Sequence, residues 1–274
     1  LFVLVTMSVK SSPALNRSRS TPRISRNTSQ HIGTADYGTQ AYWEDRYKAI
    51  IDDSQDPAEL SGLFREIKFF DWYQTYSSLK VYIYPYLQKQ KEIANNQNQV
   101  LKVLNVGCGN STFGEEMFLD NLGTVVNIDY SGSIIQYMKK RADGILAKYE
   151  QSKQNTDSSS EDNNSPAEKP QLLFIEMDIT KTLFQENSFD SVFDKGTIDS
   201  LVCSPDNSDI VKMLHEVSRI LKPGGLFFII SSGLSEKRLA HMEAPDLQWK
   251  LIKCIDLPGK NSMDHIYVFQ KHSE

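Results

Sequence analysis

Two glycines at the end of an apolar run are the first residues whose spacing indicates chemistry. The run "VLNVGCGNS" (103–111) contains Gly107 and Gly109, separated by one residue. After a first parallel strand, such a turn lets the backbone approach a cofactor closely. Dinucleotide sites have a third glycine at G-x-G-x-x-G, where this chain has Thr112, whereas S-adenosylmethionine sites often have G-x-G-x-G, where it has Ser111. The turn alone leaves both cofactor classes open.

Acidic residues follow the next two apolar runs. Asp129 ends "TVVNID" (124–129), 22 residues after Gly107. A carboxylate at that place can accept hydrogen bonds from both hydroxyls of a ribose. Asp178 closes the following run, "QLLFIEMDI" (171–179). A helix cap or a turn is the structural alternative for each of these aspartates.

The elements that must position these residues alternate along the chain. Five apolar runs are continuous rather than alternating, as expected for strands buried on both faces, and they span 100–108, 124–129, 171–179, 188–196 and 226–232. Helical stretches lie between them, most clearly "DIVKMLHEVSRILK" (209–222), whose apolar residues form one stripe. The order predicts a doubly wound, mainly parallel sheet with its ligand crevice at the carboxyl ends of the strands.

The end of the chain breaks this alternation. "LQWKLIKCIDL" (247–257) and "HIYVFQK" (265–271) are strand-like runs with no room for a helix between them. We expect a C-terminal antiparallel hairpin, which completes a seven-stranded α/β fold. Because dinucleotide folds usually continue with a second βαβ half, this ending favours S-adenosylmethionine.

Taken together, these motifs resemble those of the class I, seven-stranded S-adenosylmethionine-dependent methyltransferases. The resemblance covers residues 42–271 and rests on "YWEDRY" (42–47), "FDWY" (70–73), "GCGNS" (107–111), "IDYS" (128–131), "DKGTIDSL" (194–201) and "LKPGG" (221–225). Within the class, the chain is most similar to the protein-lysine methyltransferases of translation elongation factor 1-alpha. The resemblance implies an enzyme that uses S-adenosylmethionine and methylates a lysine side chain of a protein.

The resemblance also implies a cofactor site built from several elements. Aromatic residues before the first strand would form a lid, since their faces suit a sulfonium cation by about 0.5–2 kcal/mol of cation–π attraction, although core packing is the alternative. Asp129 would bind the ribose and Asp178 the adenine amino group. The implied cofactor-binding residues are Trp43, Tyr47, Trp72, Gly107, Gly109, Asp129, Tyr130, Asp178, Ile179 and Lys195.

The stretch "DKGT" (194–197) carries the implied catalytic residues, Asp194 and Lys195. In the family, the position of Lys195 lines the cofactor site and that of Asp194 faces the acceptor. Asp194 would therefore orient the incoming amine, which must lose a proton before it attacks. A buried ion pair or a capped turn is the alternative for this stretch.

Composition restricts the partners. The chain has 274 residues and a formal net charge of -5, but residues 1–34 carry five basic and no acidic side chains, so the rest of the chain is near -10. An acidic body argues against binding nucleic acid and suits a basic protein substrate. No apolar stretch reaches the roughly 20 residues of a membrane helix, and we expect a monomer.

Cysteine usage indicates a reducing compartment without a structural metal. Cys108, Cys203 and Cys254 are odd in number and far apart, and the histidines show no ligand spacing with them.

Two polar segments interrupt the patterned sequence. Residues 1–34 predict a disordered, basic Ser/Arg-rich arm, and 151–170 predict a disordered loop inserted in a methyltransferase domain spanning 35–274. We expect a cytoplasmic protein, although the arm also has the composition of a mitochondrial presequence. Two functional alternatives stay open: a lysine methyltransferase of the citrate synthase type in the mitochondrial matrix, and a cofactor-binding interaction subunit without turnover.

Overall fold

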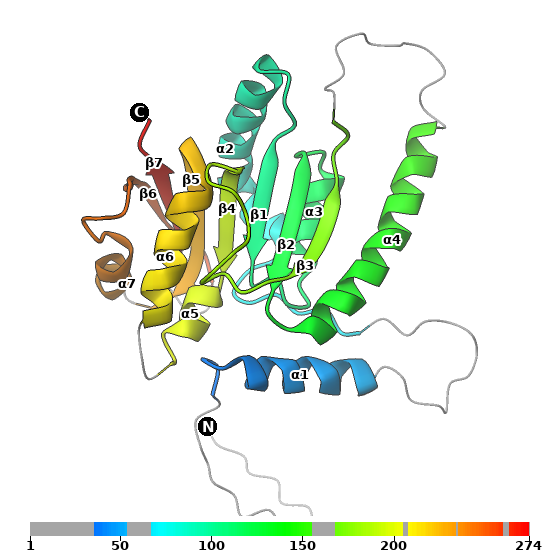
Figure 1. The fold of residues 1–274 in the computed structure, drawn as a ribbon, viewed down its shortest axis with the longest axis horizontal. Coiled ribbons are helices and arrows are strands. Elements are labelled where there is room, and N and C mark those ends of the chain that lie inside the picture. The colour runs from blue at the N-terminus through cyan, green and yellow to red at the C-terminus, as the bar shows by residue number, and fades with distance from the viewer. Residues whose placement is uncertain are drawn as a thin grey trace, which may run out of the picture. The chain divides into compact units, whose positions relative to one another are not determined.

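A seven-stranded sheet forms the centre of the fold (Figure 1). The computed structural model describes residues 36–53, 67–154, 168–204, 208–233, 235–259 and 263–273. The strands are β1 (Lys102–Val106), β2 (Thr124–Asp129), β3 (Leu172–Glu176), β4 (Phe189–Lys195), β5 (Leu221–Ser232), β6 (Trp249–Asp256) and β7 (Asp264–Lys271), in the order β3-β2-β1-β4-β5-β7-β6. The helices are α1 (Gln40–Asp53), α2 (Tyr76–Asn96), α3 (Phe113–Leu119), α4 (Gly132–Gln154), α5 (Thr197–Leu201), α6 (Ser208–Ile220) and α7 (Ser235–Met242).

The strand pairing confirms the predicted fold class. β1 pairs in parallel with β2 and β4, β2 with β3, and β4 with β5. β7 is antiparallel to β5 and forms the expected hairpin with β6. All residues of β2 and β4 are buried, because helices cover both faces of the central strands, which explains their continuous apolar runs.

The two faces of the sheet carry separate cores. Phe193 of β4 and Phe228 of β5 belong to the core under α2, α3 and α4, whereas Val192 and Phe227 belong to the core under α5, α6 and α7. Successive strand residues point to opposite faces. This alternation decides the direction of every polar side chain at the strand ends.

The helices differ from the expectations in three places. No helix lies between β3 and β4, where residues 177–188 form turns and irregular structure. The α6 helix ends at Ile220 rather than at 222, because Leu221 already pairs with Phe189 as the start of β5. The α4 helix runs to Gln154 and so occupies the start of the predicted loop insertion, whose residues 155–167 lie outside the described part of the chain, as does the predicted arm 1–34.

Among the described helices, none combines the length and the apolar character needed to cross a bilayer.

Candidate functional site

A pocket lies at the carboxyl ends of β1, β2, β3 and β4, and all ten residues expected to bind the cofactor line it. They come from α1, from the segment before α2, and from the ends of four strands. The fold therefore brings together residues that are up to 152 positions apart in the sequence, from Trp43 to Lys195.

The glycine turn after β1 needs both of its glycines. Gly107 and Gly109 have φ angles of +57° and +48°, which side chains rarely permit. A Cβ at Gly107 would lie 2.0 Å from the hydroxyl oxygen of Thr197, and one at Gly109 would lie 2.4 Å from the hydroxyl oxygen of Tyr47. Because these residues have no side chain, α5 and α1 can pack against the turn. This packing requires glycine at both positions whether or not a ligand binds.

Asp129 ends β2 with its carboxylate fixed by the backbone. One oxygen accepts a hydrogen bond from the Gly109 N–H at 2.9 Å, and the other accepts one from the Ser131 N–H at 2.9 Å. A carboxylate has about four acceptor sites, so two remain for a diol. Burial raises the pKa of Asp129 to about 6 against the lowering effect of these N–H groups. The carboxylate is therefore held ready to accept hydroxyl hydrogen bonds at neutral pH.

The segment after β3 supplies a further part of the pocket wall. One oxygen of Asp178 accepts hydrogen bonds from the backbone N–H and the hydroxyl of Thr180, both at 2.8 Å. Asp178 therefore stabilises a turn, which was the structural alternative for this residue. It also lines the pocket, beside the buried Ile179.

Helix α1 lines the pocket, and side-chain hydrogen bonds join it to α5 and to the start of α4. The indole N–H of Trp43 donates to Ser200 of α5 at 3.0 Å. Glu44 accepts hydrogen bonds at 2.6 Å from the hydroxyls of Ser131 and Ser133 at the start of α4, and these bonds lower the pKa of Glu44 to about 2. In Figure 1, α1 lies across the end of the sheet at which α4 begins. Two of the three residues expected to form the aromatic lid, Trp43 and Tyr47, therefore lie on a helix that is attached to α4 and α5, whereas Trp72 lies in the segment before α2.

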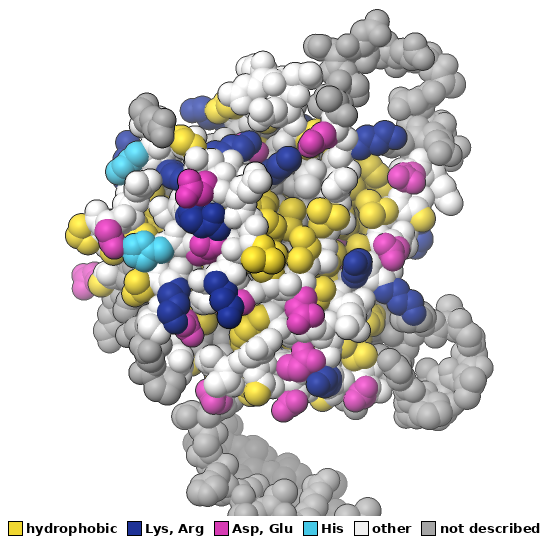
Figure 2. Space-filling model, in the orientation of Figure 1, with side chains coloured by type: hydrophobic (Ala, Val, Ile, Leu, Met, Phe, Trp, Pro, Cys, Tyr) yellow, Lys and Arg dark blue, Asp and Glu magenta, His cyan; other side chains and the backbone are white. Residues whose placement is uncertain are grey.

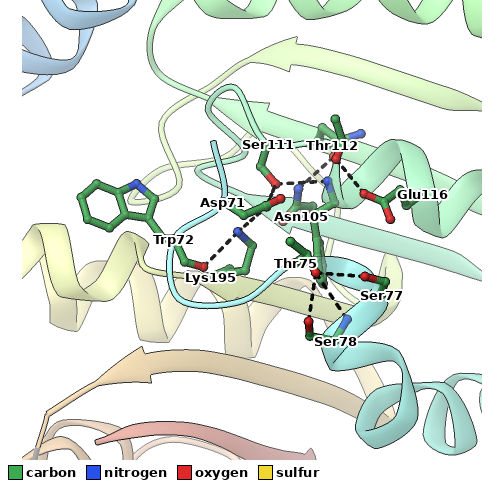
Figure 3. A network of polar contacts seen from close by, with 12 residues as sticks. Asp71, Trp72, Thr75, Ser77, Ser78, Asn105, Ser111, Thr112, Glu116 and Lys195 are labelled. Carbon is green, nitrogen blue, oxygen red and sulfur yellow. Dashed lines mark hydrogen bonds and ion pairs between the residues drawn. The ribbon is translucent and has the colours of Figure 1, made fainter. Parts of the chain in front are cut away.

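Lys195 forms a buried ion pair beside the pocket. Its ammonium nitrogen lies 2.8 Å from a carboxylate oxygen of Asp71, and that same oxygen accepts a hydrogen bond from the Ser111 hydroxyl (Figure 3). Burial lowers the pKa of Lys195, while Asp71 opposes this effect. Lys195 lines the pocket as expected, but as one member of a pair.

The position of Asp194 corrects the role that we expected for it. Its two oxygens accept hydrogen bonds from the backbone N–H groups of Thr197 at 2.8 Å and Ile198 at 3.0 Å, so the carboxylate caps α5. Asp194 is fully buried and does not line the pocket. Because Lys195 points to the α3 side, the preceding side chain must point to the α5 side. Asp194 therefore has the contacts of the structural alternative, a capped turn, and not those of a carboxylate that faces the acceptor.

The contacts of several site residues were not foreseen from the sequence. Glu44, Asp71 and Ser111 lie within the quoted motifs, but their partners are distant in the chain. Asn105 also lines the pocket, and its amide donates to Asn127 on β2 at 3.0 Å. For Asp71, its place between the aromatic residues of "FDWY" was the available hint.

A group of possible metal ligands lies elsewhere, on the β6–β7 hairpin. Ligand atoms of Cys254, Asp256 and His265 come within 4.8 Å of one another. The strand register pairs Asp256 with His265, and their side chains interact at 2.9 Å. Sequence spacing did not reveal this group, because cross-strand pairing rather than spacing assembles it.

Comparisons with known proteins agree with the fold. The model of a family described as a methyltransferase domain matches residues 97–270. The human "eEF1A lysine and N-terminal methyltransferase" is 28% identical over 199 residues, which is 72% of this chain and 22% of that protein. The bovine "EEF1A lysine methyltransferase 4" is 26% identical over 247 residues, which cover 87% of this chain and 77% of that protein. The chain thus spans about a fifth of the length of the first of these relatives.

Proposed function

Since this chain belongs to the methyltransferase-domain family, as a class I S-adenosylmethionine-dependent methyltransferase, we propose that it methylates a lysine side chain of a protein, translation elongation factor 1-alpha. The observation that carries the proposal is the pocket at the ends of β1–β4, in which a glycine turn, a fixed carboxylate and aromatic side chains meet. These groups fit the cofactor. Asp129 offers acceptors to a ribose, and the turn presents no phosphate-binding third glycine.

The chemistry requires alignment more than strong acids or bases. The cofactor supplies an electrophilic methyl group on a sulfonium. The chain's own residues orient the reactants and exclude water, and holding an amine about 3–3.5 Å from a methyl carbon provides much of the rate increase. Asp194 is engaged in capping α5, so in this proposal it supports the β4–α5 turn and does not bind the amine.

Two observations support a basic protein as the acceptor. Relatives that cover most of this chain are named for lysine methylation of the elongation factor. Acidic side chains gather over α1, which lines the pocket with Trp43 and Tyr47 (Figure 2). An acidic rim beside the pocket favours the approach of a cationic lysine within a basic surface. We further propose that the enzyme acts as a monomer in the cytoplasm.

The direct test uses purified full-length enzyme, elongation factor 1-alpha and cofactor labelled in its methyl group. We expect label on a lysine of the elongation factor, located by peptide mass mapping. A variant with Asp129→Ala serves as the control, because it removes the ribose acceptor. Label on citrate synthase, on nucleic acid or on a residue other than lysine would contradict the acceptor assignment. Cofactor binding without transfer to any protein of a proteome would instead support a binding subunit.

A further inference from the structure

The segment of residues 67–75, here called the strap, runs beside the pocket before α2. Phe70 and Trp72 of the strap line the pocket. The strap is tied to the glycine turn by the Phe70 N–H, which donates to the Asn110 carbonyl at 3.3 Å, and by the Asn110 amide, which donates to the Lys68 carbonyl at 2.9 Å. The strap is thus part of the pocket wall.

Asp71 is the charged residue through which the strap meets β4. One of its oxygens takes both the ammonium of Lys195 and the hydroxyl of Ser111, as the dashed lines in Figure 3 show. The side chains of Asp71 and Lys195 are only 14% and 5% exposed. Their attraction is therefore little weakened by water or by salt.

Lys195 brings a positive charge to a site that must accept another. Asp129, the glycine turn and Lys195 line one pocket, so a cofactor whose ribose bound to Asp129 would have its sulfonium in the pocket that Lys195 also lines. Without a counter-charge, the Lys195 ammonium would repel this cation across a medium of low dielectric constant. The charged groups that face Lys195 are Asp71 from the strap and Glu116 from α3, and Asp71 makes the direct contact.

We propose that Asp71 is a positioning residue that neutralises and orients Lys195, so that the pocket accepts the sulfonium of S-adenosylmethionine. The proposal rests on the cofactor use given above and concerns a contact 124 residues apart in the sequence. It makes a specific electrostatic claim. Loss of the Asp71 charge must weaken binding of the positively charged cofactor more than binding of S-adenosylhomocysteine, whose sulfur is neutral.

The experiment measures the dissociation constants of both molecules by calorimetry, for the wild type and Asp71→Asn, between pH 6 and pH 9. We expect the ratio of the S-adenosylmethionine constant to the S-adenosylhomocysteine constant to rise at least about ten-fold in the variant. The variant and the wild type are compared at the same pH, so that titration of Asp129 contributes equally to both proteins. A ratio equal to that of the wild type at every pH would overturn the proposal.

Two further variants separate charge from stability. Asp190→Asn is the control, since Asp190 has an exposure like that of Asp71 and forms an ion pair with Lys222, at 2.7 Å, at the other end of β4. We expect it to leave the ratio unchanged, and an equal shift there would overturn the proposal. Lys195→Met should move the ratio in the opposite direction, in favour of the cation. If Asp71→Asn does not fold, an unchanged ratio in Lys195→Met overturns the proposal.

The binding measurements need no acceptor protein. Their outcome is therefore independent of whether the labelled methyl group reaches a lysine, and failure of the acceptor assignment can be told apart from failure of the role of Asp71.

Discussion

If Asp129 binds the ribose as proposed, its titration sets the pH range in which the cofactor binds. Its pKa is raised to about 6, so in the free protein the carboxylate is ionised above that pH and protonated below it, whereas the nearby Glu44, with a pKa of about 2, stays ionised. Protonation removes an acceptor. We expect cofactor affinity to be constant from pH 9 to 7 and to fall below pH 6, approaching about ten-fold per unit. Calorimetry across this range checks it.

The Asp129→Asn variant is the companion measurement. At pH 8 this variant should bind the cofactor more weakly by roughly 1.5–3 kcal/mol, the value of a hydrogen bond to a charged group. Its cofactor affinity should no longer fall below pH 6. If the affinity of this variant still fell below pH 6, a group other than Asp129 would be responsible.

The contacts of Asp194 predict a role in stability rather than in catalysis. Its two oxygens cap α5, and Asp194→Asn replaces one acceptor by an amide donor that faces a backbone N–H. We expect a loss of about 1–3 kcal/mol in the free energy of unfolding, measured with denaturant. The dissociation constant of the cofactor should change by less than it does in Asp129→Asn. A large loss of turnover in Asp194→Asn at wild-type stability would restore the catalytic role.

At the scale of elements, Glu44 decides how α1 sits on the pocket. Its carboxylate accepts hydrogen bonds from Ser131 and Ser133, and so joins α1 to the start of α4. We expect Glu44→Ala to speed amide hydrogen exchange in α1 and to raise the cofactor dissociation constant several-fold, at about 1 kcal/mol per lost bond. Asp45→Ala, at an exposed position of the same helix, is the control and should change neither quantity. Equal effects in both variants would refute the anchoring role.

At the scale of the whole molecule, charge governs the encounter with the acceptor. The chain beyond residue 34 carries a formal charge near -10. If the acceptor is a basic protein, the Michaelis constant for it should rise when ionic strength is raised from about 0.05 to 0.3 M, because screening shortens the Debye length. The cofactor constant, set inside the pocket, should change much less. A Michaelis constant for the acceptor that is insensitive to salt would argue against electrostatic steering.

Deletion of residues 1–34 tests whether the basic arm contributes to the fold or to the activity. Residues 1–34 lie outside the described part of the chain, and the pocket is built from Trp43 onward. We expect their deletion to leave the melting temperature and the methyl transfer rate unchanged, since the stretch from Met7 onward is rich in Ser and Arg and poor in apolar residues that a core could bury. A lower melting temperature would contradict this. Fusion of the arm to a fluorescent protein would show whether it directs import into mitochondria.

The sequence by itself determined the sheet and the position of the pocket. Strands buried on both faces must be apolar throughout, and the carboxyl ends of parallel strands share one edge, so Gly107, Asp129 and Asp178 could be placed together from their runs alone. The C-terminal hairpin was predictable because no helix fits between its strands. The missing helix before β4 was not, since a short polar segment can be a turn or a helix.

Only the tertiary structure decided which side chains meet. Neighbouring residues of a strand point to opposite faces, so Asp194 and Lys195 could not both face the pocket, but sequence cannot tell which of the two does. The strand's twist and the turn at Gly196, with φ of +88°, direct Asp194 to α5 and leave Lys195 to Asp71. The contacts from Asp71 to Lys195 and from Glu44 to Ser131 join segments brought together by packing, which local pattern does not encode.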